Sequence, residues 1–183
     1  MSHPLTILQT LDLHLTRTTR LILYGRAALA LGFQSSLPAF SATYDVDCIL
    51  PLLEMNRIEA DQQFWEALEL TNTALGSSGL YITHLFSDDQ VILSPDWLHH
   101  ILPISCPGLQ WLQPFRPSTA DLILTKMMRI DPQDREDITF LLTHLEIPWS
   151  ALKPILDQAV IPDIPEIHEA FQSNQKWLLD KIE

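Results

Sequence analysis

The chain has 183 residues, of which 46% are hydrophobic and 19% charged, a composition typical of a globular protein and unlike that of a disordered acidic segment. Eleven Lys and Arg residues against 23 Asp and Glu residues give a net charge of −12. This charge argues against sequence-independent nucleic-acid binding, and no duplex DNA partner is expected, because such binding needs a basic surface that displaces counterions. It leaves open the binding of nucleotides that carry a metal ion.

Cysteine content and hydrophobic patterning predict a cytoplasmic protein. The two cysteines, Cys48 and Cys106, are too few for a disulfide framework and form no metal-binding pair, so a reducing compartment is expected. The N-terminus has no basic segment before an apolar stretch, as a signal peptide would. The longest uncharged run, 27–44, contains several polar residues and a proline, so no membrane span and no membrane partner are expected.

In chain order, the first part of the sequence predicts alternating helices and strands. Spacing of leucines by three and four predicts a helix over 5–15, and short apolar runs bounded by turn residues predict strands. The expected elements are a helix over 5–15, a strand over 21–24 ended by Gly25, a helix over 26–31, a loop over 34–41, a strand over 45–50, a helix over 56–75 with Asn56 as its N-cap, a hairpin of 80–86 and 91–93 around a polar turn, and a strand over 109–115.

After residue 117 the pattern becomes helical throughout. The expected helices cover 119–130, 132–145, 148–160 and 164–182, with a break at Pro132, because proline lacks an N–H group and disfavours helix at the preceding residue. The fold class is therefore predicted as α+β, with a mixed sheet of roughly four or five strands flanked by helices. We expect residues 1–117 to form the α/β core and residues 118–183 a helical part packed on it, in one compact unit.

Two carboxylates in the second predicted strand point to metal chemistry. Residues i and i+2 of a strand face the same way, so Asp45 and Asp47 should lie on one face, about 6.5–7 Å apart along the backbone. Such a pair is costly unless a cation or a proton lies between the groups, and Mg²⁺ favours oxygen ligands of this kind together with water and phosphate. About 20 residues earlier, Gly25 turns a strand into a helix, where backbone N–H groups can bind phosphate.

Two groups of residues together resemble the nucleotidyltransferase superfamily (polymerase β-like). The first is Gly25-Arg26 followed by Thr43-x-Asp45-x-Asp47, and the second is Asp121-Leu122-x-x-x-Lys126 followed by Asp134-Arg135-x-Asp137-Ile138. Over residues 20–145 the order of these motifs looks most like small prokaryotic AbiEii/MenT-like toxin-associated domains and related uncharacterised nucleotidyltransferase domains.

The resemblance implies a function and a set of site residues. Asp45 and Asp47 would be the catalytic carboxylates and would bind Mg²⁺ (or Mn²⁺), which carries the triphosphate of an NTP substrate. The nucleotide would be transferred to a hydroxyl group of an RNA or protein acceptor. The resemblance also implies a toxin–antitoxin relation and therefore an antitoxin-like partner protein. The residues that it places around the nucleotide are Gly25, Arg26, Thr43 and Lys126.

Two positions depart from the family pattern. Arg26 stands where a second small residue is usual, so it could hinder the approach of a phosphate or bind the phosphate with its guanidinium group. His84 stands where a third carboxylate often lies, and it is the candidate third metal ligand. These departures leave open a second function, in which a catalytically degenerate nucleotidyltransferase fold acts as a protein- or nucleotide-binding module.

The second motif also has two interpretations. Lys126 could contact a phosphate, or it could extend to solvent from the end of an apolar helix. Arg135 and Asp137 could contact substrate or form an internal ion pair.

Overall fold

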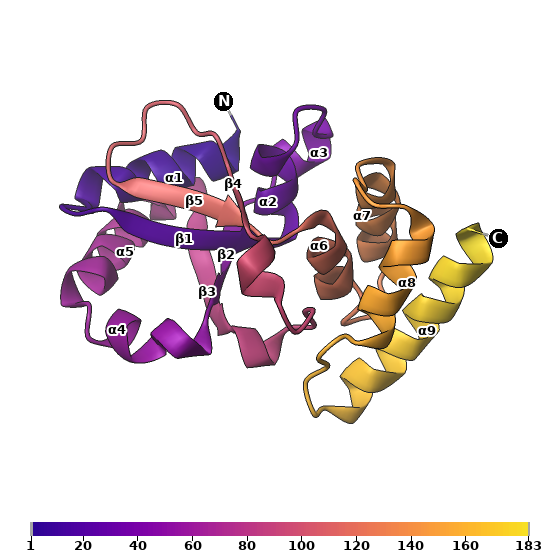
Figure 1. Ribbon diagram of the computed structural model, residues 1–183. Coiled ribbons are helices and arrows are strands. Elements are labelled where there is room, and N and C mark those ends of the chain that lie inside the picture. The colour runs from indigo at the N-terminus through magenta and orange to yellow at the C-terminus, as the bar shows by residue number, and fades with distance from the viewer. Residues whose placement is uncertain (1, 183) are drawn as a thin grey trace. The chain divides into compact units, whose positions relative to one another are not determined.

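The protein divides into two compact units. The computed structural model, shown in Figure 1, describes residues 2–182 without the side chains of residues 83, 84 and 182. The sheet unit consists of Met1–Ser87 and Ile101–Arg116, and the helical unit consists of Asp88–His100 and Pro117–Glu183. Residues 88–100 therefore belong with the C-terminal helices, although they precede residue 117.

The sheet unit contains a five-stranded mixed sheet in the order β3-β2-β1-β5-β4. β1 pairs antiparallel with β2 and parallel with β5, β2 pairs parallel with β3, and β4 pairs antiparallel with β5. Helices α1, α2 and α5 pack against these strands. The elements of this unit are α1 His3–His14, β1 Thr19–Tyr24, α2 Gly25–Gly32, α3 Pro38–Ser41, β2 Asp45–Leu50, α4 Met55–Glu59, α5 Gln62–Leu75, β3 Tyr81–Ser87, β4 Leu102–Pro103 and β5 Leu112–Arg116.

The described residues of the helical unit form four α-helices, so the predicted α+β class with a helical C-terminal half is confirmed. They are α6 Thr119–Lys126, α7 Pro132–Thr143, α8 Trp149–Asp157 and α9 Pro165–Ile182. The predicted break before Pro132 is confirmed as well: Asp131 is the N-cap of α7, and its carboxylate accepts a hydrogen bond of 2.7 Å from the backbone N–H of Gln133. Within the described part of the chain, no helix combines the length and the apolar character needed to cross a bilayer.

Helix α1 forms where the leucine spacing predicts it and supplies much of the core of the sheet unit. Ser2 is its N-cap, and the Ser2 hydroxyl accepts a hydrogen bond from the Leu5 N–H. Ile7, Leu8 and Leu11 are completely buried. Complete burial of an aliphatic side chain stabilises the fold by about 1.5–3 kcal/mol, so this helical face is a main source of the unit's stability.

Asp12, at the end of α1, fixes the start of β5. Its carboxylate accepts hydrogen bonds from three successive backbone N–H groups, those of Gln110 at 2.9 Å, Trp111 at 2.8 Å and Leu112 at 2.6 Å. Burial by itself would raise the pKa of Asp12, but these hydrogen bonds outweigh it and lower the pKa below its ordinary value. β5 begins only at Leu112, later than predicted, and the Asp12 hydrogen bonds hold the two residues before it and its first residue.

We expect Asp12→Asn to lower the free energy of unfolding by about 1.5–3 kcal/mol at pH 7, because the amide carries no charge and places a donor against backbone donors. A lowered pKa in the folded protein means that the Asp12 contribution is present above the unfolded pKa of about 4 and is lost as the pH falls through the folded value. Urea unfolding at several pH values measures both effects. Asp163→Asn, at an exposed position, is the control, and equal losses for the two variants would contradict the role of Asp12.

The predicted long helix over 56–75 is wrong, because the chain forms two helices there. α4 ends at Glu59 and α5 begins at Gln62. Between them, Asp61 is the N-cap of α5, and its carboxylate accepts a 3.0 Å hydrogen bond from the Phe64 N–H. Asp side chains compete for backbone donors in this way, which makes them better caps than interior helix residues. Asn56 therefore lies inside α4 and is not the N-cap of the long segment.

The predicted β-hairpin is also wrong. β3 pairs in parallel with β2 and not with residues 91–93, and Leu93 forms an isolated antiparallel bridge with Val160 in the helical unit. The polar turn, which forms the short 3₁₀ helix Asp88–Gln90, is where the chain leaves the sheet unit. A further difference is α3, one helical turn inside the predicted loop 34–41, which Pro38 begins at the position where proline suits a helix.

Candidate functional site

Gly25 joins β1 to α2 and lies against a carboxylate. Its φ of +63° is in the left-handed region, which glycine adopts without steric cost. A Cβ atom at this position would be only 3.3 Å from Oδ2 of Asp47, so the backbone of Gly25 and the Asp47 carboxylate are close neighbours. The pairing of β1 with β2 explains this contact, because Tyr24 and Asp47 are directly opposite each other.

Asp45 and Asp47 share one face of β2, as their spacing predicts. Both are partly exposed, whereas Val46 and Cys48, which alternate with them, are completely buried. The hydroxyl group of Thr43 donates a 2.7 Å hydrogen bond to Oδ1 of Asp45. Thr43 therefore orients one carboxylate and leaves the second oxygen of Asp45 to other partners.

Cys48 faces the core, on the side of β2 opposite to the carboxylates, because neighbouring strand residues face opposite ways. Burial raises the pKa of the Cys48 thiol well above its ordinary value, and the negative charge of Asp47 raises it further. Cys48 is therefore a protonated core residue near pH 7.

A β-bulge in β3 lies beside the carboxylate pair. Val46 is opposite Ile82 and Cys48 is opposite Leu85, so β3 has one extra residue across from Asp47. Bulges of this kind bend a strand and redirect its side chains, and they are frequent next to functional sites. The candidate third ligand His84 belongs to this segment of β3, but its side chain is outside the described residues, so its role stays a prediction.

Two aromatic side chains and Arg26 surround this end of the sheet. The rings of Tyr24 and Phe86 meet edge to face, with centroids 5.7 Å apart. The guanidinium carbon of Arg26 lies 5.5 Å from the centre of the Phe40 ring, a cation–π arrangement that links the start of α2 to α3. The structure thus places Gly25 beside Asp47 and Thr43 beside Asp45 in the sheet unit, and Arg26 follows Gly25 with its guanidinium group near Phe40.

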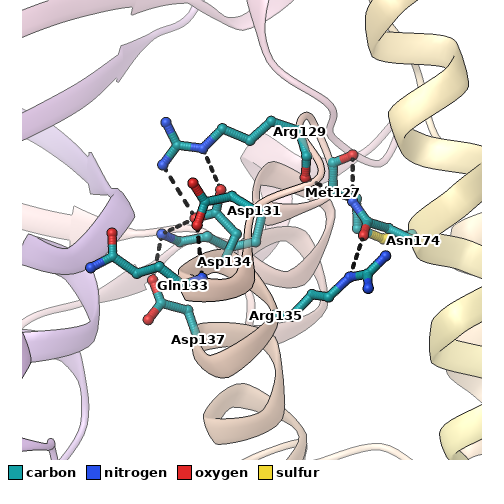
Figure 2. Close-up of polar contacts among 9 residues, drawn as sticks. Met127, Arg129, Asp131, Gln133, Asp134, Arg135, Asp137 and Asn174 are labelled. Atoms are coloured by element: carbon teal, nitrogen blue, oxygen red, sulfur yellow. Dashed lines mark hydrogen bonds and ion pairs between the residues drawn. The ribbon is translucent and has the colours of Figure 1, made fainter.

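Lys126, another residue of the predicted set, belongs to the helical unit and is buried among carboxylates there. Its Nζ atom donates hydrogen bonds to Asp134 at 3.0 Å and to Asp137 at 2.6 Å. Arg129 also pairs with Asp134, as Figure 2 shows. Because Lys126 is only 8% exposed, the interpretation that it extends to solvent is wrong. Its contact with a phosphate stays a prediction.

The electrostatics of this network stabilise the ionised form of one carboxylate. Burial would raise the pKa of Asp134, but the hydrogen bond from Arg129 and the charge and hydrogen bond of Lys126 outweigh burial and lower the pKa. Asp137 is completely buried, so the Lys126 ammonium group offsets a charge that water cannot reach.

Asn174 is a structural residue that the sequence motifs did not reveal. From α9, its side-chain amide group donates hydrogen bonds to the backbone carbonyls of Met127 and Arg129, at 3.3 and 2.9 Å, and its oxygen accepts one from Arg135 Nε at 3.2 Å (Figure 2). Arg135 also lies over the Trp177 ring. The available signal was the residue type, because asparagine inside a helix is unfavourable unless its side chain has a specific partner.

The donor set of the first site fits Mg²⁺ or Mn²⁺ that arrives with a nucleotide. Among the described residues there is no cluster of three or more His, Cys, Asp or Glu side chains that could hold a metal ion. Asp45 and Asp47 would therefore supply two oxygen ligands, and water and phosphate oxygens would supply the others. Mg²⁺ is commonly bound in this manner, through one or two carboxylates plus substrate phosphates.

Comparison with known proteins identifies one family. The family described as "Nucleotidyltransferase of unknown function (DUF6036)" matches residues 5–179, a span that includes both motifs. No curated protein and no solved structure matches the chain.

Proposed function

The chain belongs to this family of nucleotidyltransferases of unknown function, and from that premise we propose that it transfers a nucleotide from an NTP–Mg²⁺ complex to a hydroxyl group of an RNA or protein acceptor, with release of pyrophosphate. The observation that carries the proposal is the contact between the Gly25 turn and the Asp47 carboxylate. It brings a phosphate-binding element, the start of α2, next to the carboxylate pair of β2.

Different residues at this site would bind the phosphates and the metal ion. Tyr24, the N-cap of α2, makes no side-chain capping bond, and the first-turn N–H groups are donors suited to phosphate oxygens. Asp45 and Asp47 would hold the metal ion, with Asp45 oriented by Thr43. Bound Mg²⁺ supplies charge neutralisation for the triphosphate and a template for in-line attack.

The proposal also includes the kind of acceptor and a partner protein. The net charge of −12 favours a protein acceptor over an RNA, since an RNA would need a local basic surface. The resemblance to AbiEii/MenT-like toxin-associated domains adds an antitoxin-like partner protein.

The test is transfer of a radiolabelled nucleotide. The protein is incubated with each of the four NTPs, labelled on the α-phosphate, with Mg²⁺ or Mn²⁺ and with total RNA or total protein as acceptor. We expect label in one acceptor fraction and none with Asp45→Asn/Asp47→Asn. Absence of label with every NTP and acceptor would contradict the proposal.

A catalytically degenerate fold that binds nucleotide or protein is the second candidate function. Two observations favour it: Arg26 stands at a small-residue position, and His84 stands where the family often has a third carboxylate. Metal-dependent NTP binding without transfer in the same assay would identify this function.

Arg26→Ser separates the two functions. In an active enzyme the arginine binds a phosphate, so we expect the variant to bind NTP about tenfold more weakly, the loss of one charge-assisted contact. In a degenerate fold the arginine compensates the carboxylates, so its removal should raise Mn²⁺ affinity. Calorimetric titrations with NTP and with Mn²⁺ measure both, and no change in either would exclude Arg26 from the site.

A further inference from the structure

A second concave site lies at the other end of β1. A pocket of about 340 Å³ is formed by the start of β1, the end of β2, α4 and the start of α5, all within the sheet unit. Figure 1 shows α4 and α5 near the beginning of β1 and α2 at its end. Thr19 and Tyr24 are five residues apart on this strand, about 17 Å, so the pocket is separate from the site at Gly25.

Positive charge is concentrated around this pocket in an otherwise acidic protein. The sheet unit has five basic residues, all arginines, and three of them line the pocket: Arg17, Arg20 and Arg57. Glu54 and Asp61 also line it, so the lining carries 3 − 2 = +1, against −12 for the chain. The pocket therefore favours an anionic ligand.

The arginines retain hydrogen-bonding capacity for such a ligand. Arg17 pairs with Asp61, and Arg20 pairs with Glu54, each through one terminal nitrogen. A guanidinium group has five N–H donors, so most donors of both remain. Arg57 is exposed and, as far as the described residues extend, makes no hydrogen bond or ion pair. Arginine is the side chain best suited to phosphate oxygens.

The lining of the pocket is part polar and part apolar. Leu21, Leu50 and Phe64 contribute its apolar part and are at most 5% exposed, whereas the three arginines are exposed. A cavity of this size that combines apolar residues with a few charged groups is typical of small-ligand sites. A ligand that suits both features has a flat apolar body and an anionic group, as a nucleoside phosphate has.

We propose that this pocket is a second nucleotide site, which binds the phosphate of a nucleoside phosphate directly through arginine side chains and without a metal ion. The ligand is either a free nucleotide or the phosphorylated end of an RNA. The proposal goes beyond the transfer reaction, because its residues, its position on β1 and its independence of metal all differ from those of the site at Gly25.

The test is calorimetric titration of the full chain with AMP in the presence of EDTA. We expect saturable binding that is weakened about tenfold or more by Arg57→Gln, the loss expected for one charge-assisted contact. Arg57 is exposed, and its interaction with Asp61 is only a longer-range attraction between charges, so its replacement should leave the fold intact. Lys176→Gln, an exposed lysine of α9, removes the same charge and should bind AMP like the wild type. Absence of AMP binding, or equal affinity in the two variants, overturns the proposal.

Further arms identify the ligand and separate this site from the first. Asp45→Asn/Asp47→Asn should bind AMP in EDTA as the wild type does, and loss of that binding would assign AMP to the first site and overturn the proposal. Adenosine, which lacks the phosphate, should bind at least tenfold more weakly than AMP, and equal binding of the two would overturn the proposal.

Competition by a 5′-phosphorylated oligoribonucleotide, but not by its 5′-hydroxyl form, supports the proposal with an RNA end as ligand. Binding of AMP without such competition supports it with a free nucleotide.

Discussion

Replacing Asp45 and Asp47 together by Asn is expected to abolish Mn²⁺ binding and nucleotide transfer while the fold remains intact. The two carboxylates share a face of β2 and are the ligands that we propose for the cation. Without a metal ion the two carboxylates repel each other, so in the absence of metal the variant should melt at the same temperature as the wild type or higher. Calorimetric titration with Mn²⁺ and a thermal melt in EDTA measure the two effects.

The control for this double variant is Asp163→Asn/Glu166→Gln, which also removes two negative charges, at exposed positions of the helical unit. It should bind Mn²⁺ like the wild type. Equal heats of Mn²⁺ binding for the wild type and the Asp45/Asp47 variant would show that no metal site exists between these carboxylates. A large fall in melting temperature would instead show that the pair is structural.

Replacing Lys126 by Met should lower the free energy of unfolding by about 3–5 kcal/mol, because it leaves the completely buried Asp137 without its cation. Asp134 keeps its pairing with Arg129 and is less affected.

The lowered pKa of Asp134 makes the stability of the wild type depend on pH. The ionised Asp134 carboxylate stabilises the fold above the unfolded pKa of about 4, and this stabilisation is lost as the pH falls through the lower pKa of the folded protein. The wild type should therefore lose stability in acid more steeply than Lys126→Met.

Two further variants test whether the loss comes from the buried charge. Lys153→Met breaks the exposed pair with Asp157 and should cost less than about 1 kcal/mol. Adding Asp137→Asn to Lys126→Met removes the carboxylate that pairs with Lys126 and should restore part of the lost stability, and urea unfolding of all four proteins measures these changes. If Lys126→Met proved as mild as Lys153→Met, the buried ion pair would not be a source of stability.

Local patterns in the sequence were sufficient for most elements and for the core of the candidate site. The leucine spacing of α1, the short apolar runs of β1 and β2, and the glycine after β1 each act within a few residues. The same holds for the shared face of Asp45 and Asp47, because alternation along a strand does not depend on which strand lies beside it. The family match covers residues 5–179 and so includes these motifs.

Contacts between residues far apart in the sequence determined the strand pairing and the side-chain partners, which local sequence patterns could not predict. β3 pairs with β2 and not with the apolar run that follows it, and Asp47 meets Gly25 only because β1 and β2 are antiparallel in one particular register. The partners of Lys126 and Asp12, eight to 100 residues away, likewise depend on how helices and loops pack. The physical reason is that apolar periodicity specifies which face of an element is buried but not what covers it, whereas the cost of burying an unpaired charge or N–H group selects the covering partner.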